Sequence, residues 1–233
     1  MIPQNAANRQ STARGYWRIL RFDRVLLRAF FRLLYREFAW TYDLVAWLVS
    51  FGQWTAWGGA AIPRLRGRRV LELAHGPGHL LVAMSCAGYA PVGLDLSPQM
   101  GQLAHWRLRR FSQRGSIQMP SLVRARAQVL PFRSGAFDSV VSTFPTEFIA
   151  DPATLREVAR VIQPGGRAVV VPGVIFNASV PARLLEWLYR ITCQQEPEPP
   201  GIASASAEAG LTLQRERERI GMVEVLIAVA IKR

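Results

Sequence analysis

From residue 69 onward, short apolar runs alternate with segments that have a helical pattern. VLELA (70–74) precedes a helical stretch near 78–88, and PVGLDL (91–96) precedes another near 98–113. Further strand-like runs are SLVRARA (121–127), FDSVVSTF (137–144) and RAVVVPG (167–173), and a helix near 152–163 ends at Pro164-Gly165-Gly166. This alternation predicts an α/β fold, a doubly wound parallel sheet with helices on both faces.

The C-terminal end does not continue this alternation of strands and helices. Residues 211–219 and 222–232 read as two strands around a short Ile220-Gly221 turn. A terminal antiparallel hairpin on a parallel sheet predicts a mixed sheet of seven strands. Before it, residues 179–193 have a helical pattern and the Pro-rich stretch 194–206 is expected to be a loop.

The N-terminal part divides in two. Residues 1–15 are polar and predict a flexible tail, and residues 16–62 predict a basic, amphipathic helical cap in front of the main domain, residues 63–233. Within the cap, Tyr16–Arg36 is one helix and a second helical region runs from about 38 to 62. Six arginines in and just before the first helix, at 14, 18, 21, 28, 32 and 36, lie mostly three or four residues apart.

The charge is strongly basic, with 29 Lys and Arg against 16 Asp and Glu, a net charge of +13. Such a balance favours an anionic partner, either nucleic acid or a membrane surface. The arginine stripe of residues 16–36 can be a solvated face, can contact nucleic acid or can lie on an anionic bilayer. The apolar face of the same helix can equally dock on the main domain. We favour the bilayer, because aromatic side chains flank the stripe and no nucleic-acid-binding module is recognisable.

Targeting signals and cysteines bear on location. The chain shows no signal peptide and no run of about 18 uncharged apolar residues. Cys86 and Cys193 form neither a disulfide framework nor a metal motif. We expect a cytoplasmic protein, peripheral on the inner face of the membrane.

A glycine-rich turn follows the first strand, His75-Gly76-Pro77-Gly78-His79. Glycines let the backbone approach a ligand, and the next helix aims its amides at that ligand. Glu72 lies near the end of this strand, and Asp95 ends the second strand, where a carboxylate can accept hydrogen bonds from ribose hydroxyls. The pattern predicts an adenosine-containing cofactor. NAD is disfavoured, because the third glycine of the dinucleotide fingerprint is Leu81.

The order of motifs resembles the Rossmann-like class I methyltransferases that use S-adenosylmethionine. The matching segments are Val70–Gly78, Val92–Asp95, Leu130–Phe132, Phe137-Asp138 and Leu155–Gly166 (LREVARVIQPGG). Tyr42-Asp43-Leu44, Ser50-Phe51-Gly52 and Trp57 are similar to a motif of the ubiquinone/menaquinone C-methyltransferases and related phospholipid N-methyltransferases. Ala46, Ala74, His75 and Arg126 depart from the family's usual residues.

The resemblance implies a site for S-adenosylmethionine, with S-adenosylhomocysteine as product. The turn would hold the methionine end, Asp95 the ribose, residues near Leu96 and Ala127 the adenine, and Thr143 and Phe144 the methyl-transfer site. The implied cofactor contacts are Glu72, Ala74, His75, Gly76, Gly78, Asp95, Leu96, Met100, Arg126, Ala127, Gln128, Thr143 and Phe144.

Three residues are candidates for catalysis: Glu147, Tyr42 and His75. Each has a plainer explanation, since Glu147 can be a solvated loop carboxylate, Tyr42 can pack in a helix and His75 can pack in its loop. His75 and His79 lack a third ligand nearby, so we expect no metal site.

These observations predict a methyltransferase whose acceptor is small and apolar or lipid-like, because the cap is rich in Trp and Phe. The alternatives are a nucleic-acid methyltransferase, which the charge favours, and a non-catalytic, membrane-associated protein that binds the cofactor. Nothing in the sequence predicts the oligomeric state.

Overall fold

A computed structural model of the chain describes residue 50 and residues 52–115, 117–176 and 202–233. The tail, most of the predicted cap, Tyr42 and the predicted helix at 179–193 lie outside the described residues.

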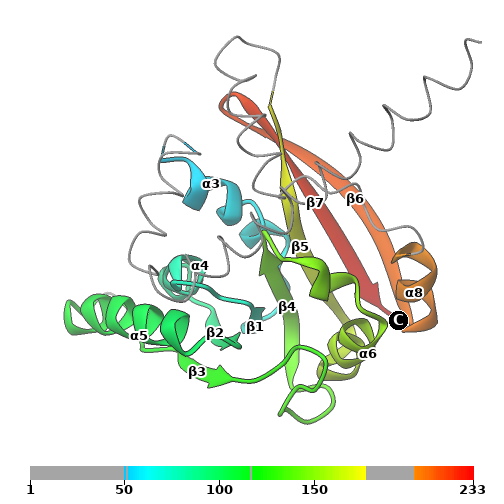
Figure 1. Cartoon of the computed structure of the whole chain (residues 1–233), viewed down its shortest axis with the longest axis horizontal. Helices are drawn as coiled ribbons and strands as arrows, with labels where there is room; N and C mark the ends of the chain where they lie inside the picture. Colours follow the sequence, from blue (N-terminus) through cyan, green and yellow to red (C-terminus); the bar gives the residue numbers. More distant parts are fainter. Residues whose placement is uncertain (1–49, 51, 116, 177–201) are drawn as a thin grey trace, which may run out of the picture.

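The centre of the molecule is one seven-stranded sheet with the strand order β3-β2-β1-β4-β5-β7-β6 (Figure 1). The strands from β1 to β5 pair in parallel, and β7 pairs antiparallel with both β5 and β6. The predicted mixed sheet with its C-terminal antiparallel hairpin is therefore confirmed. The strands are β1 (Arg69–Leu73), β2 (Ala90–Asp95), β3 (Ser121–Arg124), β4 (Phe137–Thr143), β5 (Ile162–Phe176), β6 (Leu211–Ile220) and β7 (Val223–Lys232).

Helices cover both faces of the sheet, as a doubly wound fold requires. One apolar core joins α3, α4 and α5 to one face, through side chains such as Trp57, Leu81 and Leu108. The second core joins α6 to the other face through Val158 and Ala159. The helical elements are α3 (Trp54–Gly59), η2 (Ile62–Arg64), α4 (His79–Cys86), α5 (Pro98–Gln113), η3 (Glu147–Ala150), α6 (Pro152–Val161) and α8 (Ile202–Glu208). In the described part of the chain, no helix combines the length and the apolar character needed to cross a lipid bilayer.

Some boundaries differ from the sequence predictions. Residues 202–206, the last part of the expected loop, instead belong to α8, because the Ala/Ser-rich segment after the prolines packs Ser206 into the interior against the sheet and α6. The predicted helix over 38–62 is interrupted in its described part, where a turn at Gly52 separates residue 50 from the short α3. Strand β3 ends early, at Arg124, and the hairpin turn is Gly221-Met222 rather than Ile220-Gly221.

Strand β5 is longer than predicted. The helix before it ends at Val161, and the Pro164-Gly165-Gly166 stop signal lies inside the irregular start of the strand. Gly166 has to be glycine here, because a Cβ would lie 2.6 Å from the backbone oxygen of Asp138 in β4.

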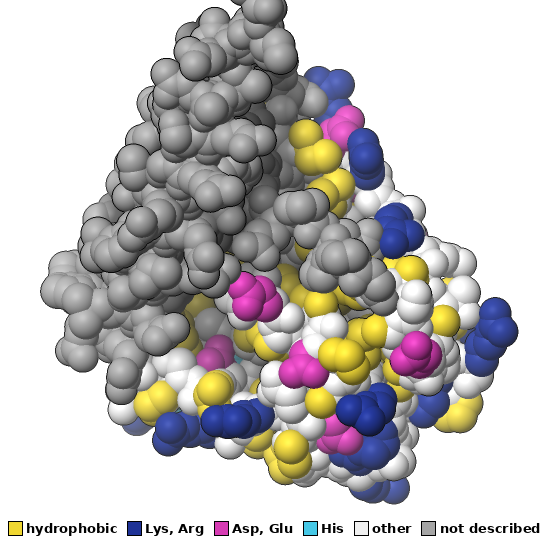
Figure 2. Space-filling view, turned by 45° about the vertical axis from the view of Figure 1, so that its right-hand side comes forward, with side chains coloured by type: hydrophobic (Ala, Val, Ile, Leu, Met, Phe, Trp, Pro, Cys, Tyr) yellow, Lys and Arg dark blue, Asp and Glu magenta, His cyan; other side chains and the backbone are white. Residues whose placement is uncertain are grey.

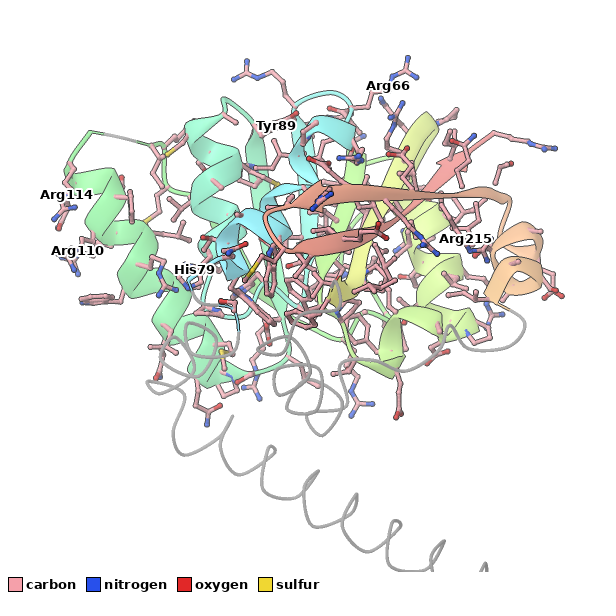
Figure 3. The ribbon with its side chains drawn as sticks, turned by 90° about the horizontal axis from the view of Figure 1, so that it is seen from above. Arg66, His79, Tyr89, Arg110, Arg114 and Arg215 are labelled. Carbon is pink, nitrogen blue, oxygen red and sulfur yellow. The ribbon has the colours of Figure 1, made fainter. Side chains whose placement is uncertain are left out.

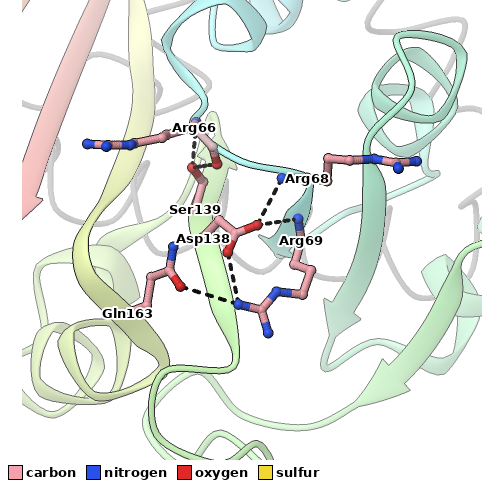
Figure 4. Close-up of polar contacts among 6 residues, drawn as sticks. All are labelled: Arg66, Arg68, Arg69, Asp138, Ser139 and Gln163. Atoms are coloured by element: carbon pink, nitrogen blue, oxygen red, sulfur yellow. Dashed lines mark hydrogen bonds and ion pairs between the residues drawn. The ribbon is translucent and has the colours of Figure 1, made fainter.

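A polar network ties the amino ends of β1 and β4 together (Figure 4). The Asp138 carboxylate accepts hydrogen bonds from the Arg68 and Arg69 amides at 2.9 and 2.8 Å, and from the Arg69 guanidinium at 2.9 Å. The Ser139 hydroxyl donates to the Arg66 carbonyl oxygen at 2.8 Å. These contacts hold the register of the two central strands, whose opposite, carboxyl ends carry the candidate site.

Candidate active site

The candidate residues gather at the carboxyl ends of β1, β2 and β4. The chain runs from β1 to one side of the sheet, to β2 and β3, and then crosses to β4 on the other side. Ligands of open α/β sheets bind where the strand order reverses in this way, outside the carboxyl ends. Here that place is between β1 and β4.

The turn after β1 has an unusual backbone conformation. Ala74, Gly76 and Gly78 have φ angles of 54°, 53° and 81°, in the left-handed region that favours glycine. A Cβ on Gly76 would meet nothing within 4 Å, so the backbone there borders open space. A Cβ on Gly78 would lie 3.0 Å from the Ala104 Cβ, so Gly78 lets α4 begin close to α5.

Asp95 connects this turn to the end of β2. One carboxylate oxygen accepts a hydrogen bond from the Gly76 amide at 2.9 Å, and the other accepts one from the Ser97 amide at 2.8 Å. Two backbone donors from different loops therefore fix the plane of the carboxylate.

Glu72 is the most unusual residue of the site. It is 1% exposed, and its Oε2 atom is buried without a hydrogen-bond partner. Burial, and then the neighbouring negative charge of Asp95, raise the pKa of the Glu72 carboxyl well above its ordinary value. A buried carboxyl group that lacks a partner beside a second carboxylate is suited to a cationic ligand, which would supply both the missing partner and the missing charge.

His75 is the first residue of the turn and is 5% exposed. Its Nδ1 atom is 2.7 Å from the Gly76 carbonyl oxygen, and its ring packs on Gly93 of β2, where a Cβ would lie 2.9 Å from the His75 Cδ2. Burial lowers the pKa of the imidazole, although the charge of Asp95 acts in the opposite direction. This environment suits a neutral, packed histidine, and its catalytic role stays a prediction. Among the described residues, no group of three or more His, Cys, Asp or Glu side chains could hold a metal ion.

The residues expected near the adenine come from the ends of neighbouring strands. β2 and β3 pair up to Asp95 and Arg124, and the Arg124 guanidinium donates to the Leu96 carbonyl oxygen at 3.1 Å. Leu96 is exposed and Met100 is buried. Arg126 is exposed and Ala127 is buried, and the Gln128 amide donates to the Asp151 carboxylate at 3.1 Å.

The end of β4 carries an aromatic cluster. Phe144 has φ of 50°, its amide donates to the Val171 carbonyl oxygen at 2.7 Å, and its ring centroid lies 4.1 Å from that of Trp54. Trp57, 2% exposed, contacts Phe176 edge-to-face at 6.0 Å. We call Trp54, Trp57, Phe144 and Phe176 the aromatic cluster. Gly58 of the same helix lies against Thr143, where a Cβ would be 3.7 Å from its Cγ2.

Sequence reasoning missed Trp54. The signal was available, since Trp54 and Trp57 lie three residues apart, which places two indole rings on one side of a short helix. Of the remaining candidates, Glu147 begins η3 and is exposed, just beyond the end of β4. Tyr42 lies outside the described residues.

The chain is similar to known methyltransferases. The family described as "Methyltransferase domain" matches residues 71–170, from β1 into β5. A demethylmenaquinone methyltransferase of Thermus thermophilus is 35% identical over 144 residues, 59% of this chain and 63% of the relative. A ubiquinone/menaquinone biosynthesis C-methyltransferase of Geotalea uraniireducens is 32% identical over 139 residues, 56% of this chain and 57% of the relative. The chain thus spans about three fifths of the length of these curated relatives.

Solved structures share the fold. Geranyl diphosphate C-methyltransferase of Streptomyces coelicolor, in complex with Mg²⁺, geranyl diphosphate and S-adenosyl-L-homocysteine, superposes with a TM-score of 0.58 at 14% identity and covers 77% of this chain and 79% of that one. The YcgJ protein of Bacillus subtilis superposes with a TM-score of 0.57 at 19% identity and covers 76% of this chain and 98% of that one.

Proposed function

We propose that this chain, which matches a methyltransferase domain over residues 71–170 and is similar to ubiquinone/menaquinone methyltransferases, transfers the methyl group of S-adenosylmethionine to a small apolar or lipid-like acceptor. The observation that carries the proposal is the buried, unpartnered Glu72 carboxyl beside Asp95 at the glycine turn. The proposed catalytic unit is residues 63–233, with residues 16–62 as a cap over the acceptor.

The residues present fit this cofactor. Its methionine end carries an ammonium group, and the buried Glu72 carboxyl offers an unused acceptor atom. The turn leaves open space at Gly76, and Asp95 is already oriented by two amides to accept hydrogen bonds from ribose hydroxyls. Leu96, Met100 and residues 126–128 would enclose the adenine.

Methyl transfer from S-adenosylmethionine does not require a strong general acid or base. S-adenosylmethionine supplies a methyl group on a positively charged sulfur that is already a good leaving group. The protein then has to orient the acceptor and exclude water. Thr143 and Phe144 would line this position, and Glu147 would orient a protic acceptor or accept its proton.

The aromatic cluster supports an apolar acceptor. Trp54 and Phe144, both half-buried at the end of β4, would favour flat or hydrocarbon groups over charged ones. The names of two curated relatives refer to demethylmenaquinone and to ubiquinone/menaquinone biosynthesis, and a quinone ring with an apolar tail would suit these aromatic side chains. Such an acceptor resides in the bilayer, which supports a cytoplasmic protein that works at the inner face of the membrane.

Calorimetry with S-adenosylhomocysteine tests the cofactor site. We expect binding by the full chain, and a loss of at least tenfold in affinity for Asp95→Asn and for Glu72→Gln. Glu147→Gln, which removes a carboxylate near the site but outside the cofactor contacts, keeps the affinity. Undetectable binding, or unchanged binding by Asp95→Asn, rejects the assignment.

The acceptor is identified with labelled cofactor and a cell extract divided into lipid, small-molecule and RNA fractions. Label in the lipid fraction, in a compound that co-migrates with a quinone, is expected. Label in RNA instead supports the nucleic-acid methyltransferase, and cofactor binding with no transfer to any fraction leaves a non-catalytic protein.

A further inference from the structure

One stretch of the described chain has a charge unlike the rest. Between Asp95 and Asp138 the sequence contains no Asp or Glu and seven arginines, at 107, 109, 110, 114, 124, 126 and 133. This stretch forms α5, β3 and the loop that leads into β4. Because α5 packs on β3, these residues share one edge of the molecule (Figure 1). In contrast, the face in Figure 2 carries acidic side chains among the basic ones.

Helix α5 presents its basic side chains to solvent. Met100, Ala104 and Leu108 are buried. His105, Trp106, Arg109, Arg110 and Arg114 are exposed, and Arg110 and Arg114 point away from the molecule in Figure 3. Arg107 instead donates a hydrogen bond to the Pro77 carbonyl oxygen and thereby ties α5 to the glycine turn.

Apolar side chains are exposed on the same stretch. Of the six large hydrophobic residues that are exposed in the described part of the chain, four belong to it: Leu96, Trp106, Met119 and Val129. Trp106 is 61% exposed, and the Arg110 guanidinium lies 5.6 Å from its ring centroid. An indole beside guanidinium groups, in a stretch whose sequence lacks Asp and Glu, is the combination found at the headgroup level of membranes.

We propose that the exposed face of α5, with the neighbouring β3 edge, seats the protein on an anionic lipid bilayer. Arginines 109, 110 and 114 contact the lipid phosphates, and Trp106 inserts among the headgroups. Nucleic acid would use the charge but would leave the exposed aliphatic side chains Met119 and Val129 without a role. This inference is independent of the proposed methyl transfer and of residues 16–36.

The test is the partition of the full chain onto vesicles of phosphatidylcholine with and without phosphatidylglycerol. An arginine near an anionic surface contributes about fivefold to binding. Arg109→Gln/Arg110→Gln/Arg114→Gln should therefore lower the partition coefficient at least tenfold on the anionic vesicles. Arg66→Gln/Arg156→Gln/Arg219→Gln removes the same charge from exposed positions elsewhere and should leave most of the binding.

Two further variants sharpen the result. The triple arginine-to-lysine variant at 109, 110 and 114 should retain binding, because a bilayer responds to charge rather than to guanidinium geometry. Trp106→Ala should weaken binding severalfold at unchanged charge. Circular dichroism and S-adenosylhomocysteine binding report whether each variant is folded.

Three outcomes overturn the proposal. Absence of binding to anionic vesicles is the first. Equal losses in the α5 variant and its charge-matched control are the second, since they would reflect net charge alone. The third is an α5 variant that loses binding to a short RNA probe while its vesicle binding stays unchanged.

Discussion

Two non-glycine residues in the described chain have left-handed backbone conformations, and both lie at the candidate site. Ala74 follows β1 and Phe144 follows β4, at the ends of adjacent strands. Such conformations cost about 1–3 kcal/mol each and persist only where the surroundings impose them. At Ala74 the left-handed conformation is held by the turn, whose Gly76 amide donates a hydrogen bond to Asp95. At Phe144 it is held by the hydrogen bond from the Phe144 amide to β5.

Replacing Ala74 by glycine should relieve this strain. We expect Ala74→Gly to raise the free energy of unfolding by about 0.5–1 kcal/mol, since glycine adopts a positive φ without a Cβ clash. Ala83→Gly, inside helix α4, is the matched control and should lower it by about 1 kcal/mol. Urea unfolding measures the free energy of unfolding of both variants. If Ala74→Gly is less stable than the wild type, the backbone at Ala74 is not strained.

Glu72 predicts a dependence of stability on pH. The folded state raises the pKa of its carboxyl above the ordinary 4.5, so ionisation costs more in the folded than in the unfolded state. Its contribution to stability is therefore complete below pH 4.5 and is lost as the pH rises through the folded pKa. His75, with a lowered pKa, acts in the opposite direction near neutrality.

The Glu72→Gln variant isolates this effect. The difference in unfolding free energy between the variant and the wild type should grow in favour of the variant as the pH rises from 4.5 towards neutrality, in the absence of cofactor. Urea unfolding at several pH values measures it. A difference that is independent of pH would mean that Glu72 ionises normally.

At the scale of elements, sequence patterns located the segments whose ends carry local signals. The predicted range of α5, 98–113, matches the structure, because Ser97 caps the Met100 amide and Pro98 occupies the first turn. Helix α8 was missed because the prolines before it masked a short Ala/Ser segment that tertiary packing makes helical. The site residues at the ends of β1, β2 and β4 could be predicted, because the carboxyl ends of parallel strands meet at one edge of the sheet. The Trp54–Phe144 contact could not be predicted, because it joins segments 90 positions apart that no local sequence pattern relates.

The entry into β1 depends on a close contact between Gly67 and Asp138. A Cβ on Gly67, which has φ of 66°, would lie 2.4 Å from the Asp138 Cβ.

Burial tends to raise the pKa of the Asp138 carboxyl, but the hydrogen bonds from Arg69 and Arg68 lower it overall. Its contribution to stability is therefore present above pH 3.8 and is lost as the pH falls through the folded pKa.

A double-mutant cycle tests this junction. Gly67→Ala should cost about 3 kcal/mol of stability through the clash and the strained φ, and Asp138→Ala about 2–4 kcal/mol through the lost hydrogen bonds. The double variant should lose less than the sum, because removing the carboxyl makes room for the new methyl group. Additive losses in urea unfolding would show that the two positions do not interact.

At the scale of the whole molecule, the sheet has two edges, and each is protected against pairing with other strands. β3 is only four residues long. β6 spans ten residues, and residues 214–219 read QRERER. Glu216 and Glu218 bind Arg64 at 2.8 and 2.5 Å on one side, and Arg215, Arg217 and Arg219 lie on the other side of the strand. Charges along a long edge strand oppose association with a second sheet.

Removing part of this charge should expose the edge. Arg217→Val/Arg219→Val leaves the Arg64 ion pairs intact and raises the β propensity of β6, so the chain should still fold but associate through that strand. Sedimentation velocity over a range of concentrations should show larger species for this variant than for the wild type. Arg66→Val/Arg156→Val adds the same apolar groups away from any sheet edge and should sediment as the wild type does. If both variants associate equally, general hydrophobicity explains the effect, and the arginines of β6 have no protective role.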